Sequence, residues 1–512
     1  MRTNLKTSSK DIGKTLLEII IENGYTLSAP CGGKGVCGNC KVKATGNLSS
    51  LSEKENELLT KDELENNIRI SCLTKALGEA EIFLEDSAFD VLTGGELALD
   101  TLSPAADLSL SENPVGISID IGTTTVALSF FSLKDGTLLF EKGIVNPQRA
   151  FGADVISRIE YVTNNPDGLS KLQTILVEAL NDVIDEFCQI KGFERSNIID
   201  VTIAANSTME LIFAKISPAS LGHAPFTLAS NLGENIPAVD IGLNINKKAQ
   251  IYFMPLISGF IGGDTVAVML YLDFDKRNDC AFVVDIGTNG EMALTKNNEI
   301  FACSTAAGPA FEGAKIKFGT GSITGAITDV ALNNGISLKT IGNAKPSGIC
   351  GSGLIALTSE LLKNEIIEDT GLLSDESEYS GEEDNETVFY LTEDKKLYIT
   401  QRDVREIQLA KAAFFAGTDT LIDLSDNIDA AYVAGGFGMA LDLEKAADIG
   451  LFPRKILSIA QKTGNSAGKG AALCLLSENM RKRAEQIASS TKIVELSGSD
   501  AFEDRFIEAM MF

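Results

Sequence analysis

This chain contains little histidine, no tryptophan and relatively few basic residues. Its 512 residues include one histidine, His223, and no tryptophan. Histidine-based catalytic triads and histidine-rich metal sites are therefore excluded. Lysine and arginine number 44 against 71 aspartate and glutamate residues, a formal net charge of −27. Nucleic acid and anionic membranes bind basic faces, so we expect neither as a partner. The acidic excess indicates a solvated surface, with a basic partner as the alternative.

Long apolar runs are also missing. No stretch approaches the roughly 18 to 20 apolar residues of a membrane span. The apolar run at residues 16–21 is short, is interrupted by Glu18, and does not read as a signal peptide. No separate flavin or pyridine-nucleotide fingerprint is found. We therefore expect a cytoplasmic chain, and its length predicts two or three domains.

The nine cysteines fall into two groups. Five are scattered and read as buried thiols, whereas four have the spacing C-x5-C-x2-C, then 31 residues, then C. The first three lie on a glycine-rich loop whose backbone N–H groups can point at sulfur. This pattern predicts a [2Fe–2S] cluster, for which plant-type potentials are about −400 mV. Structural zinc, which usually pairs two C-x2-C units, and free thiols are the alternatives. The predicted ligands are Cys31, Cys37, Cys40 and Cys72.

The cysteine segment resembles a ferredoxin-type β-grasp domain, residues 1–85, with the x5 spacing of the adrenodoxin-like variant. We expect a helix at residues 15–23 closed by Gly24, strands at 41–44 and 80–84, and a helix from the capping-box pair Ser52 and Glu55 to residue 59. Residues 86–114, rich in small and acidic residues, read as a semi-flexible tether or a simple connection.

Two similar segments organise the remainder of the chain. Residues 115–131 read VGISIDIGTTTVALSFF, and residues 281–294 read AFVVDIGTNGEMAL. Each predicts a strand, a D-x-G-T turn and a returning strand. Such a turn brings N–H groups and Thr hydroxyls to phosphates, and its Asp can hold hydrated Mg²⁺. One copy is ordinary turn chemistry, but two copies predict a two-lobed nucleotide site. The predicted contacts are Asp120, Gly122, Thr123, Thr124, Asp285, Gly287, Thr288 and Asn289.

A third glycine-rich element follows at residues 429–439, DAAYVAGGFGM, where a buried strand is expected to end beside the base or ribose at Gly435, Gly436 and Phe437. In this order the three elements resemble the actin-like ATPase superfamily. The resemblance implies Asp264, in a G-D-x-x-A element, as the catalytic base, with a helix N-cap as the alternative. It also implies Glu312 as a ribose contact. The acidic residues 374–386 read as a mobile loop.

A ferredoxin loop, CGGKGVCGNC, joined to such an ATPase resembles the reductive activators of corrinoid proteins, as do NPQRAFGADVISRI, CSTAAGPAFEGA and SGICGSGLI. Longer members carry an additional domain where about 28 residues stand here. The resemblance implies a multidomain α/β and α+β chain: a β-grasp ferredoxin domain at 1–85, a linker at 86–114, and a two-lobed actin-like (RNase H-like, ASKHA) ATPase domain at 115–512.

The same resemblance implies an activity, cofactors and partners. A [2Fe–2S] cluster delivers one electron to Co(II) of a corrinoid protein, giving Co(I), and ATP with Mg²⁺ drives the transfer. A low-potential electron-donor protein, a homodimer and anaerobic methyltransferase metabolism are implied as well. Two other readings stay open: a small-molecule kinase with a redox-sensing domain, and a redox-gated, non-enzymatic scaffold.

Overall fold

The computed structural model describes most of the chain. Gly24, the expected helix cap, and residues 86–101 of the expected tether lie outside the described residues. The described residues are 2–23, 25, 27, 29, 31–38, 40–85, 102–333 and 335–512. Within these ranges no helix is both long and apolar enough to cross a membrane.

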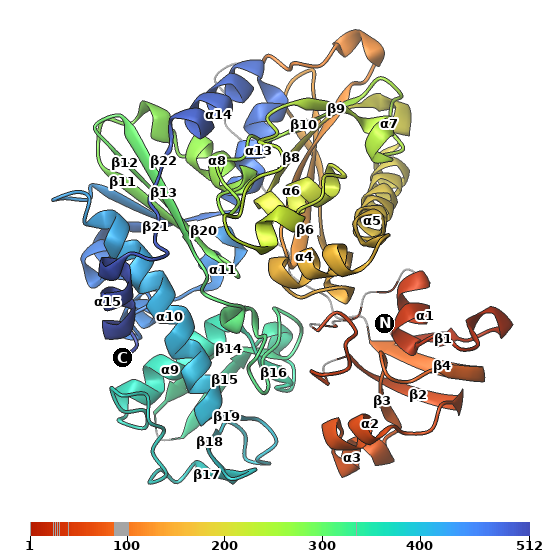
Figure 1. Ribbon diagram of the computed structural model, residues 1–512, viewed down its shortest axis with the longest axis vertical. Helices are drawn as coiled ribbons and strands as arrows, with labels where there is room; N and C mark the ends of the chain where they lie inside the picture. The colour runs from red at the N-terminus through yellow and green to blue at the C-terminus, as the bar shows by residue number, and fades with distance from the viewer. Residues whose placement is uncertain are drawn as a thin grey trace.

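The N-terminal domain, in red in Figure 1, is one antiparallel sheet covered by a helix. Leu16, Ile19 and Ile20 of the helix pack on the sheet, and burial of each side chain contributes about 1.5–3 kcal/mol. The predicted capping box at Ser52 is confirmed: its partner Glu55 is fully buried and also pairs with Arg69 at 2.9 Å. The sheet order is β1 (Arg2–Lys6), β4 (Ala76–Glu85), β2 (Lys41–Leu48) and β3 (Ile68–Ile70), with helices α1 (Leu16–Glu22), α2 (Glu53–Leu58) and α3 (Lys61–Glu65).

The rest of the chain is built on two six-stranded sheets of matching topology. In each, three antiparallel strands are followed by two strands that run parallel to the first. The two predicted hairpins are confirmed as β5–β6 and β11–β12. The first sheet is β7 (Leu138–Val145), β6 (Thr125–Ser132), β5 (Val115–Ile121), β8 (Ile198–Ala205), β10 (Gln250–Phe253) and β9 (Asn235–Pro237). The second is β21 (Ala460–Gly464), β20 (Ala430–Ala434), β11 (Ala281–Ile286), β12 (Gly290–Lys296), β13 (Glu299–Thr305) and β22 (Lys492–Ile493).

One helix from each repeat joins the two lobes. Helix α8 (Gly263–Tyr271) follows the fifth strand of the first repeat, and α13 (Ser466–Leu476) follows the fifth strand of the second. They cross so closely that a Cβ on Gly470 would lie 2.1 Å from the Ala267 carbonyl oxygen. The remaining helices of the lobes are α4 (Val155–Asn164), α5 (Gly168–Lys191), α6 (Ser207–Phe213), α7 (Ala238–Ile241), α10 (Gln401–Ile422), α11 (Gly435–Ala440), α12 (Leu443–Asp448), α14 (Glu478–Ser490) and α15 (Asp500–Glu508).

Residues between β13 and α10 include short strands and a helix, in blue-green at the lower left of Figure 1, that share the hydrophobic core of the second lobe. The mobile loop expected at residues 374–386 is wrong for its second half, because residues 380–383 and 386 lie in a hairpin in which Tyr390 donates a hydrogen bond to Glu383 at 2.8 Å. The strands are β14 (Ala326–Leu332), β15 (Ile336–Thr340), β16 (Gly348–Ile349), β17 (Ser380–Glu383), β18 (Glu386–Tyr390) and β19 (Tyr398–Thr400), and the helix is α9 (Gly351–Lys363).

The described part of the expected tether is docked on the ATPase lobes. Leu102 and Leu110 pack against a cluster that contains Phe131 and Leu475. The Ser103 N–H donates to the Leu476 carbonyl at 3.0 Å. From residue 102 onward the segment therefore behaves as part of the ATPase core, since its apolar side chains are partly buried there.

Candidate iron–sulfur and nucleotide sites

The four predicted cluster cysteines come together as two pairs. The Cys40 and Cys72 sulfurs lie 3.3 Å apart, and the Cys31 thiol is hydrogen-bonded to Cys37. The hydrogen bond between the two thiols lowers the pKa of Cys40 to about 6 and raises the pKa of Cys72. Two pairs of thiols match the four-cysteine ligand set of a [2Fe–2S] cluster, two to each iron.

The loop backbone also suits a cluster. Burial raises the pKa of Cys31, but N–H groups of Val36, Cys37 and Gly35 outweigh it and lower that pKa overall. Donors aimed at sulfur stabilise a thiolate and tune the potential of a cluster. Such a tight wrap needs left-handed backbone, which glycine adopts without strain. The loop glycines with positive φ are Gly32, Gly33, Gly35 and Gly38.

The first D-x-G-T turn is held by side chains from outside its own hairpin. Asn146 Nδ2 donates to the Gly122 carbonyl at 2.8 Å, and Asn206 Nδ2 donates to Thr123 Oγ1 at 3.2 Å. Arg158, fully buried, donates to the Thr123 carbonyl. The turn is therefore fixed before any phosphate binds.

The second turn approaches the third glycine element. The Gly287 N–H donates to the Asn289 carbonyl at 3.1 Å, which closes the turn. A Cβ on Gly435, whose φ is +84°, would lie 2.4 Å from Asp285 Oδ1. The predicted glycine loop is instead the start of helix α11, and Phe437 stacks on Phe311 with centroids 6.0 Å apart. The predicted base or ribose contact at Gly435, Gly436 and Phe437 stays a prediction.

Three half-buried aspartates face one another between the lobes. Burial, with mutual repulsion, raises the pKa of Asp120 and of Asp285 to about 7. Burial raises the pKa of Asp264 to about 6. A divalent cation bound beside one or two of these carboxylates would favour their ionised forms.

The alternative reading of Asp264 as a helix cap is wrong. Gly262 occupies the N-cap position of α8, and Asp264 lies within the first turn. Its Oδ1 accepts a hydrogen bond from the Thr265 N–H at 2.7 Å. The carboxylate is thereby oriented by its own helix, and its charge acts on both Asp120 and Asp285.

Glu312 lies between the two turns. Its Oε2 accepts from Thr288 Oγ1 at 2.7 Å, and a hydrogen bond with Thr124 and the charge of Arg149 favour its ionised form. Burial is the larger effect and raises the pKa of Glu312 overall. Glu312 therefore lies at the hydroxyls of the two predicted phosphate turns, and the ribose contact that the resemblance implies stays a prediction.

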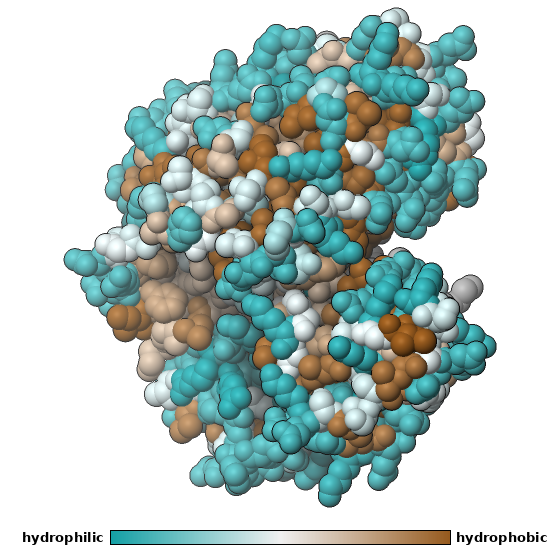
Figure 2. Space-filling model, turned by 45° about the vertical axis from the view of Figure 1, so that its right-hand side comes forward, coloured by the Kyte–Doolittle hydropathy of each residue, from teal (hydrophilic) through white to brown (hydrophobic). Residues whose placement is uncertain are grey.

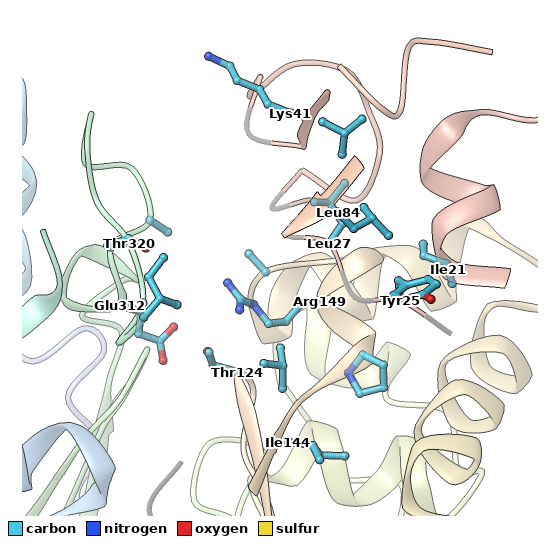
Figure 3. Close-up of a pocket in the computed structure, with 18 of the residues that line it drawn as sticks. Ile21, Tyr25, Leu27, Lys41, Leu84, Thr124, Ile144, Arg149, Glu312 and Thr320 are labelled. Carbon is cyan, nitrogen blue, oxygen red and sulfur yellow. The ribbon is translucent and has the colours of Figure 1, made fainter. Parts of the chain in front are cut away.

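Arg149, Thr124 and Glu312 face the floor of a cleft of about 1810 Å³ (Figure 3). Its other walls come from the N-terminal domain, including Tyr25 and Leu27, and from the loop that precedes β14. Figure 2 shows the surface hollowed where the N-terminal domain meets the lobes. Hydrophilic residues cover most of that face, in keeping with the acidic composition.

Sequence reasoning missed four site residues. Burial and nearby Arg149 lower the pKa of Arg158 to about 9. Asn465, the N-cap of α13, is hydrogen-bonded to Asp120, and Glu291 of β12 faces Asp264 and Asp285. The signal for the arginines was present, because both lie in the phrase NPQRAFGADVISRI.

Three family descriptions match consecutive parts of the chain. Residues 3–77 match a 2Fe–2S iron–sulfur cluster binding domain, and residues 115–277 match the RACo middle region. Residues 279–512 match the C-terminal domain of RACo, the ASKHA domain. These ranges follow the N-terminal sheet and the two repeats in order.

Individual relatives agree. The corrinoid activation enzyme RamQ of Eubacterium limosum is 35% identical over 422 residues, 78% of this chain and 71% of RamQ. The [Co(II) methylated amine-specific corrinoid protein] reductase of Methanosarcina barkeri is 25% identical over 70% of each chain. A solved structure, "Reductive activator for corrinoid,iron-sulfur protein", aligns with a TM-score of 0.72 and 28% identity over 99% of this chain and 96% of that one. The chain belongs to the family of reductive activators of corrinoid proteins.

Proposed function

We propose that this chain catalyses ATP-dependent reductive activation of a corrinoid protein. The observation that carries the proposal is the joining, in one chain, of a two-pair cysteine loop to a two-lobed ASKHA fold with both phosphate turns. The substrate cobalt takes up one electron and passes from Co(II) to Co(I). ATP is hydrolysed to ADP and phosphate in the same cycle.

The four cysteines hold the electron carrier. When bound, a [2Fe–2S] cluster supplies one electron at low potential. Cys31, Cys37, Cys40 and Cys72 would hold this cluster through their sulfurs. Val36 exposes 57% of its surface on the loop between two of these ligands, so the cluster end of the domain is accessible to a partner.

The carboxylates and turns perform the nucleotide chemistry. The two turns bind the phosphates, and Asp264 accepts a proton from the attacking water. Asp120 and Asp285 would hold a Mg²⁺ ion, which would neutralise charge on the phosphates. Closure of the lobes on nucleotide supplies the driving force. For one electron, 59 mV corresponds to about 1.4 kcal/mol, so a coupling of ~5 kcal/mol covers roughly 200 mV.

The remaining expectations belong to this proposal. The electron donor is a separate low-potential protein, because no flavin or pyridine-nucleotide motif is present in the sequence. The proposal also includes that the protein is a homodimer, that it is cytoplasmic, and that it serves anaerobic methyltransferase metabolism.

The products of ATP turnover distinguish this function from a small-molecule kinase. We expect ³¹P NMR, with a corrinoid protein present, to show inorganic phosphate and ADP in equal amounts. In the kinase alternative, the phosphate would instead appear as a phosphoester on an added small-molecule acceptor.

A variant of the cluster loop tests the redox half. Cys37→Ser removes one cluster ligand and leaves both turns untouched. It is expected to abolish cobalt reduction while the chain still binds and hydrolyses MgATP. Retained reduction would exclude the cluster as the electron carrier.

A further inference from the structure

Three successive carbonyls of the first phosphate turn are held by one segment, residues 146–160, here called the coupling segment. Asn146 donates twice, from Nδ2 to the Gly122 carbonyl at 2.8 Å and from its N–H to the Thr124 carbonyl at 2.9 Å. Arg158 Nη2 donates to the carbonyl between them, that of Thr123. The conformation of the turn therefore depends on the position of this segment.

The loop at residues 31–38, here called the cluster loop, packs against the same segment. Gly32, next to the ligand Cys31, lies so close that a Cβ on it would be 2.7 Å from the Phe151 carbonyl oxygen. Two residues further on, Lys34 Nζ lies 2.9 Å from Glu160 Oε2. Figure 1 shows α4, which carries Glu160, facing the N-terminal domain.

Arg158 joins these two contacts inside the segment. Its Nε donates to the Gly152 carbonyl at 3.0 Å while Nη2 holds the Thr123 carbonyl. Gly152 follows Phe151 directly and is itself confined, because a Cβ there would lie 2.5 Å from Ser157 Oγ. Direct contacts thus run from the phosphate turn, through one buried guanidinium, to the residue beside a cluster ligand.

We propose that the coupling segment links nucleotide binding to seating of the cluster loop, with Arg158 as the positioning residue, and that each event favours the other. The proposal rests on the proposed function in taking the turn as a phosphate site and the loop as the cluster holder. A carbonyl that accepts a hydrogen bond polarises the N–H of the same peptide group. The hydrogen bonds from Asn146 and Arg158 to the turn carbonyls would therefore make the N–H groups of the turn stronger donors to a phosphate. Coupling of this kind acts equally in both directions.

The affinity of the intact, cluster-loaded chain for MgADP, measured anaerobically by calorimetry, tests the coupling from the loop side. Lys34→Glu and Glu160→Lys each break an exposed ion pair and are expected to weaken binding by roughly two- to five-fold. The Lys34→Glu/Glu160→Lys double variant restores the pair and the affinity. Lys54→Glu, the same charge change elsewhere on the domain, leaves the affinity unchanged.

Hydrogen exchange tests it from the nucleotide side. MgADP is expected to slow amide exchange at residues 31–38 in the wild type and not in Arg158→Lys. The lysine keeps the charge but has no guanidinium to bond the Gly152 and Thr123 carbonyls through separate nitrogens. The visible spectrum of the cluster stays the same in both. Normal MgADP binding with unaltered loop exchange, or single variants with wild-type affinity, overturns the coupling alone. Absence of any MgADP binding overturns the proposed function and the coupling with it.

Discussion

At the residue scale, the nucleotide site is a set of acids that burial keeps partly protonated. Asp120, Asp264 and Asp285 come from three separate elements, the first strand of each repeat and the start of α8. Their raised pKa values mean that the empty site binds protons near neutral pH. A divalent cation would take the place of those protons.

Asp264 is expected to act on the attacking water. Asp264→Ala removes the carboxylate and should lower ATP hydrolysis by about 10²- to 10⁴-fold, with nucleotide affinity largely kept. Rates from phosphate release and affinities from calorimetry give the comparison. Asp240→Ala, an exposed aspartate of α7, is the control. Equal turnover in the two variants would remove Asp264 from the chemistry.

The raised pKa values also predict how the metal-free chain responds to pH. Folded Asp285 has a pKa of about 7 and unfolded Asp about 3.9, so the folded state binds more protons between these values. Stability is therefore present below the lower value and is lost as pH rises toward 7. In EDTA we expect the thermal midpoint to fall from pH 5 to pH 7.5, and to fall less in Asp285→Asn. An identical slope in both chains would show that this carboxyl titrates normally.

At the element scale, the crossing of α8 and α13 holds the lobes together. Gly470 is required because the Ala267 carbonyl occupies the place of a side chain. Gly470→Ala forces the helices apart, and we expect about 1–3 kcal/mol of destabilisation, seen as a lower thermal midpoint. The exposed Ser489→Ala on α14 should leave the midpoint unchanged. An unchanged thermal midpoint in Gly470→Ala would mean that α8 and α13 lie farther apart in solution than they do in this structure.

The elements also show what sequence patterns capture. Both hairpins and the capping box at Ser52 followed from local alternation and spacing, because backbone pairing decides them. The acidic composition of residues 374–386 predicts a loop and does not reveal the hairpin at 380–390, which cross-strand contacts stabilise. Local patterns do not predict the role of Arg158, because its partner Thr123 is brought to it only by the tertiary fold.

At the scale of the whole molecule, one buried ion pair spans the two lobes. Asp200 on β8 lies 2.6 Å from Arg481 on α14, and the guanidinium also lies over the Tyr252 ring at 4.6 Å. Burial still raises the pKa of Asp200 to about 6, although Arg481 opposes the shift. Ionisation of this buried carboxyl therefore costs more in the folded chain than in water, and the charge of Arg481 offsets part of that cost.

Breaking that pair on one side should be costly. Asp200→Asn leaves Arg481 buried without its counter-charge, and we expect about 3–5 kcal/mol of destabilisation. The double variant Asp200→Leu/Arg481→Met removes both charges and should lose less than Asp200→Asn alone. Denaturant unfolding of the three chains measures the difference. A double variant that loses as much stability as Asp200→Asn, or more, would show that the two side chains do not act as a pair.

The central claim concerns electron transfer to cobalt. The most direct measurement is the visible spectrum of a Co(II) corrinoid protein mixed anaerobically with the dithionite-reduced chain, with and without MgATP. We predict that Co(I) appears with MgATP and fails to appear without it or with Cys37→Ser. Co(I) formed equally well without nucleotide, or no Co(I) despite a reduced cluster and several corrinoid partners, would contradict the account.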